Sequence, residues 1–344
     1  QIEAGFQDTA THWSSEGLSI EVVQYERGLL HSSAETLWTY VAVRDTAEDE
    51  AVGTDEEDGD NPTAATHEPV QFKATHQISH GPWPWGHAAQ LQSRFVPVAG
   101  TQPQLVAALQ GRPALQWDTT VGWGRSSRHV ATSPALEWTA DGSTITWGGL
   151  QAQWSMPAAH RGMQGTVHLP SLRVQAPASG TLQLADAALH FDLQQPADQQ
   201  FLTGPWGLTL ASLEHQPVEG AGEPLQVRGL SLESTATLAN QVVGMTLAAR
   251  LQSAQAGARV ASDMALEMAL RNVDAAWLNQ MLQARKSESD GRDGLQQLQR
   301  SLPQLLARQP GLDIQRLALR TPEGLSEIRA SLAYTGNGQQ MQTL

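Results

Sequence analysis

The residues best suited to chemistry are the 11 histidines, because the chain has no cysteine. His76 and His80 are separated by three residues, a spacing that lets two imidazoles on a helix bind one zinc ion. They lie in VQFKATHQISH, however, where apolar and polar residues alternate as in a strand with one wet face. Four residues of a strand span about 13 Å, too far for two ligands of one ion. We therefore expect hydrogen-bonded, partly buried histidines, no metal site and no cofactor.

A second group with chemical potential is Ser126 and Ser127, which lie near Arg125, Arg128 and His129. The sequence has no GxSxG, SxxK, GxxxxGK[ST] or GxGxxG motif around these or other residues. An exposed turn has the same composition as this cluster. We expect no catalytic residue, and a hydrolase of unknown specificity is the last of the functional alternatives.

The net charge of −14 is concentrated in one stretch. Residues 45–60 hold nine acids and no base, and without them the net charge is only −5. The stretch lacks the alternating ligands and central glycine of a calcium loop, so we expect a solvated insertion over 45–66. With no basic stripe elsewhere, nucleic acid is not an expected partner.

Tryptophan is unusually frequent, with 11 residues against five phenylalanines and three tyrosines. Two interpretations remain open for the densest cluster: the rings fill a core, or they line a groove for an acyl chain or a hydrophobic peptide. The candidate groove residues fall within 38 positions and are Trp117, Trp123, Trp138, Trp147 and Trp154.

The elements that must position these residues are mainly strands. Period-two runs of about ten residues follow one another, with Asp141-Gly142 and Pro322-Glu323-Gly324 as hairpin turns. The predicted fold is mainly β with some α: a long antiparallel meander sheet, either open, curved or sandwich-like. The predicted regions are 1–44 (a short helix and the first strands), 45–66 (the acidic insertion), 67–272 (the sheet), 273–311 (helical) and 312–344 (a closing hairpin).

Helices are predicted at two places. Ile2, Phe6 and Trp13 share one face of a short N-terminal helix. Near the other end, Asp274 is placed to cap a helix that begins with AAWLNQMLQAR, and LQQLQRSLPQLLAR follows it. We expect these two segments to form a helical hairpin that covers the sheet.

The segment SHGPWPWG ends the strand that contains the two histidines. Pro82 and Pro84 each remove a backbone donor and hold the preceding residues in extended conformations. The ladder of hydrogen bonds should therefore stop after His80. We expect a stiff plug at the sheet edge there, with a docking segment for a partner as the alternative.

Two short motifs in this order resemble those of the YdgA-like family of bacterial proteins, and the helical region and the final TPEG hairpin are similar as well. The motif residues are Tyr25, Arg27 and Gly28, then His80, Gly81, Pro82, Trp83 and Pro84. The resemblance implies a periplasmic protein of a Gram-negative bacterium, attached to the inner membrane by an anchor upstream of Gln1. It implies no reaction. From the residues themselves we expect Arg27 to cap carbonyls and Gly28 to adopt a conformation that other residues avoid, with anion binding as the alternative.

No run of eighteen apolar residues is present. The expected function is non-enzymatic binding or scaffolding in the cell envelope, with an envelope protein or a second copy of the chain as partner. The first alternative is the holding or transport of a lipid or another hydrophobic ligand in an apolar β-groove.

Overall fold

The computed structural model describes residues 17–41, 70–81, 86–98, 100, 102–140, 142–287 and 301–336. The chain forms two compact units, residues 1–120 and 121–344. The boundary between them falls inside the stretch 67–272 that the alternation assigned to one β region. The predicted N-terminal helix, the acidic insertion and the segment from Pro82 to Trp85 lie outside the described residues.

The first unit is built on four antiparallel strands, each paired with the next along the chain. Two leucines of a short helix, Leu105 and Leu109, are buried, and Pro103 occupies the first turn of this helix, where its missing N–H costs nothing. The helix ends at Gln110, whose φ is 52°. The elements are β1 (Leu18–Glu26), β2 (His31–Tyr40), β3 (Val70–His80), β4 (Ala89–Pro97), α2 (Pro103–Leu109) and β5 (Leu115–Val121), which reaches the boundary.

Period-two alternation places one face of β3 in the interior of this unit. Ala74, His76 and Ile78 are buried, while the intervening Thr75 and Gln77 are exposed. Their partners on β2 and β4 follow the same pattern, because directly opposite residues share a face. The strand prediction for residues 70–80 is confirmed.

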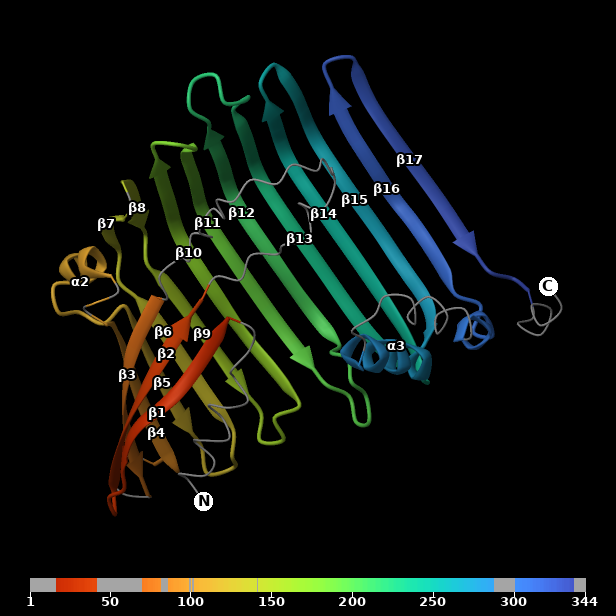
Figure 1. The fold of residues 1–344 in the computed structure, drawn as a ribbon. Coiled ribbons are helices and arrows are strands. Elements are labelled where there is room, and N and C mark those ends of the chain that lie inside the picture. The colour runs from red at the N-terminus through yellow and green to blue at the C-terminus, as the bar shows by residue number, and fades with distance from the viewer. Residues whose placement is uncertain are drawn as a thin grey trace, which may run out of the picture. The chain divides into compact units, whose positions relative to one another are not determined.

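The second unit begins with four short strands and continues as a meander of eight longer ones (Figure 1). Among the short strands, β7 pairs with β8 and β9 with β10 in chain order, but β6 also pairs with β9 and β8 with β10. The strands from β10 to β17 pair strictly in chain order. The strands are β6 (Ser127–Ser133), β7 (Leu136–Ala140), β8 (Ser143–Trp147), β9 (Leu150–Met156), β10 (Gly162–Ala176), β11 (Gly180–Gln194), β12 (Gly204–Gln216), β13 (Leu225–Ala239), β14 (Val242–Ala256), β15 (Arg259–Asp274), β16 (Gly311–Thr321) and β17 (Gly324–Ala333).

A line of six residues crosses the meander from β10 to β15, and we call it the crease. In each ladder the pairs directly before and directly after the crease keep the same register, and the crease pair between them is left out. Every second crease residue has a left-handed backbone, with φ of 51° at Asp186, 65° at Gly229 and 49° at Asp263. The six residues are Pro170, Asp186, Ala211, Gly229, Gln252 and Asp263.

The crease explains a slip in the sequence alternation. In β13 the apolar residues are Leu225 and Val227 before Gly229, but Leu230 and Leu232 after it. A regular strand would put Val227 and Leu230 on opposite faces, because they are three positions apart. A left-handed residue bends the strand as a β-bulge does. Gly229 therefore takes up one extra position in the alternation, and the apolar residues before and after it stay on the same face of the sheet.

One helix packs at the end of the meander beyond β15 (Figure 1): α3 (Ala275–Ser287). Its N–H at Trp277 donates to Asp274 Oδ1 at 2.9 Å, so the predicted cap is confirmed. A small core is formed here by Phe201, Val243 and Val273, with Ala275 fully buried.

The predicted mainly β, antiparallel fold is confirmed, and so is the meander from β10 to β17. The hairpin turns are also found: Gly142 and Gly324 have φ of 75° and 148° between β7 and β8 and between β16 and β17. Of the expected helical hairpin the structure describes α3 and a helical segment over 301–306. A second sheet packed as in a sandwich is not seen among the described residues.

Candidate functional site

The first candidate site is the histidine pair of β3, which the structure places in two separate hydrogen-bond networks. His76 is 6% exposed, with Nε2 2.9 Å from Thr36 Oγ1 and Nδ1 2.8 Å from Ser93 Oγ. Trp38 Nε1 donates to the same Thr36 hydroxyl at 2.8 Å. A neutral imidazole fits both contacts, because one ring nitrogen donates and the other accepts. Burial lowers the pKa of His76 from 6.5 to about 4.

His80 belongs to the network of the family motif. Its Nε2 lies 2.9 Å from Ser32 Oγ, and the N–H of Gly28 donates to the same hydroxyl at 3.4 Å. The N–H of His80 also donates to Leu30 O at 2.7 Å. Thus the turn after β1 and the end of β3, far apart in sequence, are joined through the hydroxyl of Ser32.

The structure corrects the reason expected for Gly28. Its φ is not in the left-handed region, so conformational freedom is not what requires a glycine. A Cβ at this position would collide with the carbonyl oxygen of His31. Gly81, by contrast, does have a left-handed backbone, with φ of 100°. Tyr25 lies on β1 directly opposite Ala34, and Ala34 belongs to the buried face of β2. Arg27 makes no hydrogen bond or ion pair to a described residue, so the expected carbonyl cap is not found there.

Two of the serine–histidine contacts among the described residues, those of Ser93 and Ser127, are closed to a substrate. Ser93 is 3% exposed, and Ser127, whose Oγ is 2.9 Å from His129 Nε2, is 9% exposed. His129 is stacked on Trp154, with ring centroids 4.9 Å apart. Burial, followed by the charge of His160, lowers the pKa of His129. These hydroxyls therefore serve as hydrogen-bond partners of the imidazoles. Among the described residues no three histidine, aspartate or glutamate side chains are grouped to hold a metal ion.

The second candidate site is an apolar surface on the meander, the leucine face. It consists of three rows of directly opposite residues on β10 to β15, and opposite residues share a face. The rows are Leu169, Ala187, Leu210, Leu230, Leu251 and Met264; Val167, Leu189, Leu208, Leu232, Ala249 and Leu266; and Gly165, Phe191, Trp206, Ser234, Leu247 and Met268.

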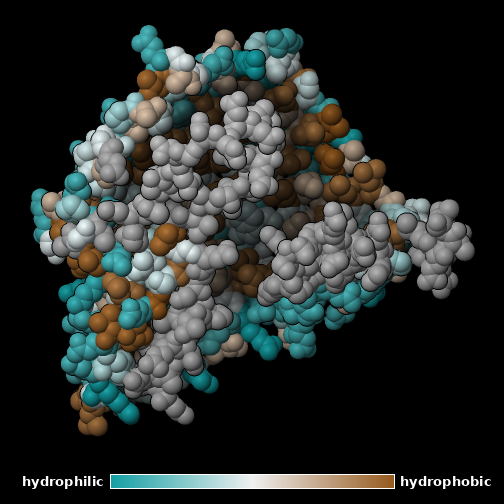
Figure 2. Space-filling model, in the orientation of Figure 1, coloured by the Kyte–Doolittle hydropathy of each residue, from teal (hydrophilic) through white to brown (hydrophobic). Residues whose placement is uncertain are grey.

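The leucine face carries no charge, and Ser234 is its one hydroxyl-bearing residue. Side chains of the first two rows, such as Leu208, Leu232 and Leu266, are only half-buried. Brown, apolar atoms gather over this part of the meander in Figure 2. Six strands about 4.8 Å apart and three rows about 6.8 Å apart give a footprint of roughly 600 Å². Exposed apolar patches of a few hundred Å² are often functional surfaces.

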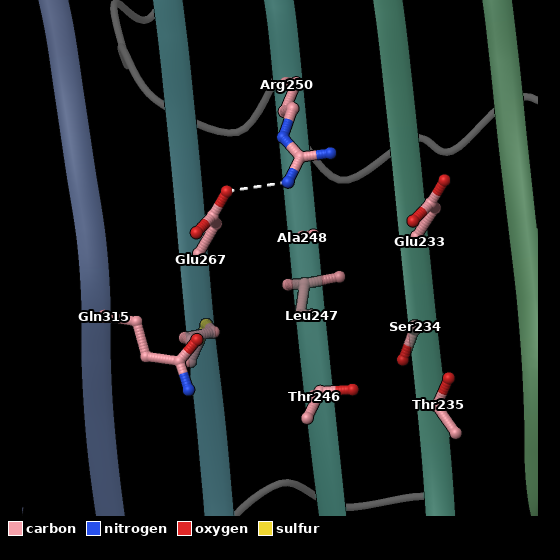
Figure 3. A pocket seen from close by; sticks show the side chains of 10 residues that line it. Glu233, Ser234, Thr235, Thr246, Leu247, Ala248, Arg250, Glu267 and Gln315 are labelled. Carbon is pink, nitrogen blue, oxygen red and sulfur yellow. Dashed lines mark hydrogen bonds and ion pairs between the residues drawn. The ribbon is translucent and has the colours of Figure 1, made fainter.

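The opposite face of the same strands is polar. There Arg250 Nη2 donates to Glu267 Oε1 at 2.8 Å, beside Glu233, in a shallow hollow of about 230 Å³ (Figure 3). The hydrogen bond and the charge of Glu267 raise the pKa of Arg250. Thr235 and Thr246 lie on the same face. The two faces therefore differ in chemistry: the polar face can be hydrated, whereas the leucine face can contact hydrocarbon.

Three of the five tryptophans that are candidates for core or groove extend the apolar rows of this sheet. Trp154 is opposite Gly165, in the third row, and Trp147 is opposite Leu172 beyond the crease. Trp138 is opposite Ile145, which pairs with Val174. Trp117 lies in β5, and Trp123 is 58% exposed in the turn after it. The cluster is thus spread along strands, and leucines, which the sequence did not single out, make up half of the leucine face.

Taken together, the fold and these two sites define an antiparallel β protein with one long amphipathic sheet. The chain belongs to a bacterial protein family of unknown function, DUF945, whose family model matches residues 1–344. No curated protein and no solved structure is significantly similar to it. No helix among the described residues is long and apolar enough to cross a membrane.

Proposed function

We propose that this protein is a non-enzymatic binding protein of the bacterial cell envelope, and that its leucine face holds a hydrophobic ligand with acyl chains. The observation that carries the proposal is the unbroken aliphatic character of the first two rows on β10 to β15. A surface so poor in hydrogen-bonding groups matches hydrocarbon, because protein interfaces carry roughly one hydrogen bond per 100–200 Å² and are rich in tyrosine and arginine.

The energetic scale supports an acyl chain as the occupant. Each methylene removed from water contributes about 0.8 kcal/mol. A chain lying along one row of six strands buries many methylenes against Leu208, Leu232 and their neighbours without losing any protein hydrogen bond. The small core that includes Val243 and Val273 closes the face at the α3 end.

The location proposed is the periplasm, with attachment to the inner membrane. This part rests on the motif residues, which resemble those of the YdgA-like family. In the structure Gly28, Ser32 and His80 form one network, so the two motifs belong to one structural unit.

A second candidate is docking of an envelope protein or of a second copy of the chain. The observation that favours it is the exposure of β17, in which Ile328 is 56% and Leu332 65% exposed. Exposed apolar side chains on a strand are typical of protein contacts.

Lipid extraction tests the first candidate. The protein is purified from a Gram-negative host without detergent, extracted with organic solvent and analysed by mass spectrometry. The proposal predicts an acyl lipid in a fixed molar ratio near one or a small integer. A lipid-free protein that also fails to take up a fluorescent fatty acid would leave the docking function as the better account.

A further inference from the structure

A hollow of about 530 Å³ lies in the first unit, between the end of β1, the start of β2 and the end of β3. Its polar lining consists of side chains that face one another across the strands. Glu26 is opposite Ser33, and Ser33 is opposite Gln77. His31 and Ser79 are the next opposite pair on the same face, and His31 Nδ1 is hydrogen-bonded to Ser79 Oγ at 3.2 Å.

Arg27 lines the same hollow and is left without a partner among the described residues. Its neighbour Glu26 is engaged instead by Gln24 Nε2, which donates to Oε1 at 2.7 Å. Some arginines of the second unit, such as Arg250 and Arg271, lie in ion pairs instead. The motif glycine next to Arg27 packs closely on the backbone of His31, because a side chain at Gly28 would collide with His31 O.

We propose that this hollow binds a phosphate diester through Arg27. The guanidinium fork matches two oxygens of a phosphate, and the hydroxyl of Ser33 and the side-chain amide of Gln77 are donors in the same lining for the others. A diester carries one negative charge, whereas a phosphate monoester carries up to two near neutral pH. The carboxylate of Glu26 in the same lining repels the second charge, so the site selects the monoanion.

A phosphate diester has two possible sources, a soluble glycerophosphodiester or the headgroup of a phospholipid. The two probes are therefore glycerophosphoglycerol in solution, followed by calorimetry, and vesicles of phosphatidylglycerol in phosphatidylcholine, followed by co-sedimentation. The hollow and the leucine face have no residue in common. Vesicle binding that depends on Arg27 distinguishes it from binding through acyl chains alone.

The test compares Arg27→Gln with Arg94→Gln in the full chain. Arg94 is an exposed arginine of β4 in the same unit, outside the hollow, so the change of charge is matched. We expect saturable binding of at least one probe by the unmodified protein, at least tenfold weaker binding by Arg27→Gln, and a change below twofold for Arg94→Gln. Unchanged thermal unfolding of Arg27→Gln shows that the fold is intact.

Glu26→Gln provides a second, independent readout. It should strengthen binding of inorganic phosphate severalfold relative to glycerophosphoglycerol, because the repulsion of the second charge is removed. Binding of neither probe by the unmodified protein, or equal losses in Arg27→Gln and Arg94→Gln, would overturn the proposal.

Discussion

His80 and Ser32 come from different strands, 48 positions apart in the chain, and their side chains meet at 2.9 Å between Nε2 and Oγ. The same hydroxyl accepts the N–H of Gly28. One serine side chain thus holds the turn after β1 against the end of β3, and this contact gives the two sequence motifs a common structural reason.

Ser32→Ala should therefore destabilise the first unit. The change leaves the Gly28 N–H and the His80 imidazole with one partner fewer in a part-buried place, which costs about 1–3 kcal/mol. Chemical denaturation measures the loss. Ser33→Ala is the matched control, because Ser33 is the neighbouring serine on the exposed face of β2, and it should change stability by less than about 0.5 kcal/mol. Equal effects of the two changes would show that Ser32 does not have this role.

Acid should weaken the first unit through His76. The pKa of this histidine is about 4 in the folded protein and 6.5 when exposed, so between these values the unfolded chain binds a proton that the folded protein does not. The contribution is present in full above pH 6.5 and is lost as the pH falls to about 4, by about 3 kcal/mol. Denaturation at a series of pH values measures it, and His76→Gln should remove this part of the pH dependence. A His76→Gln protein with an unchanged pH profile would contradict the assignment.

The attachment of α3 should depend on Asp274. Burial alone would raise the pKa of Asp274, but the Trp277 N–H, Arg308 and Gln304 all donate to it and together lower the pKa. Because the folded pKa is depressed, the stabilisation is present at neutral pH and is lost as the pH falls through that value. Asp274→Ala should cost about 1–3 kcal/mol, whereas Asp274→Asn keeps a capping oxygen and should cost less. Hydrogen exchange of the α3 amides reports the local effect, and equal protection in both variants would argue against the cap.

The crease should be sensitive to substitution of its glycine. Gly229 has φ of 65°, and a Cβ there would lie 2.8 Å from Gln252 Cβ, so Gly229→Ala is both strained and crowded. We expect a loss of about 1–3 kcal/mol. The control is Gly244→Ala in β14, where φ is not left-handed and the nearest atom is the Thr237 hydroxyl at 3.3 Å. If Gly229→Ala were as stable as the control, the crease would not require its left-handed residues.

Local features of this fold could be predicted from the sequence, whereas the features that depend on pairing could not. The alternation around His76 predicted β3, and Asp274 before an apolar stripe predicted the cap of α3, because both signals lie within a few residues. The partner of His76, Thr36, lies 40 positions away, and nothing local identifies it.

The crease and the leucine face show the same limit. The break in the alternation between Val227 and Leu230 is visible in the sequence, but one strand alone does not show that the break marks a bend. Only the register shows that Gly229 lies in line with Asp186 and Asp263. The tryptophans drew attention because they are rare residues. The common leucines, which form half of the leucine face, gave no comparable signal.

The central claim is that the leucine face binds hydrocarbon, and paired substitutions on the two faces of the meander test it most directly. Leu208→Gln with Leu232→Gln changes the leucine face, and Thr209→Gln with Ser231→Gln changes the polar face of the same two strands. The measurement is a titration with a fluorescent long-chain fatty acid. The account predicts at least tenfold weaker binding for the leucine pair and a change below twofold for the polar pair; equal affinities in both variants would contradict it.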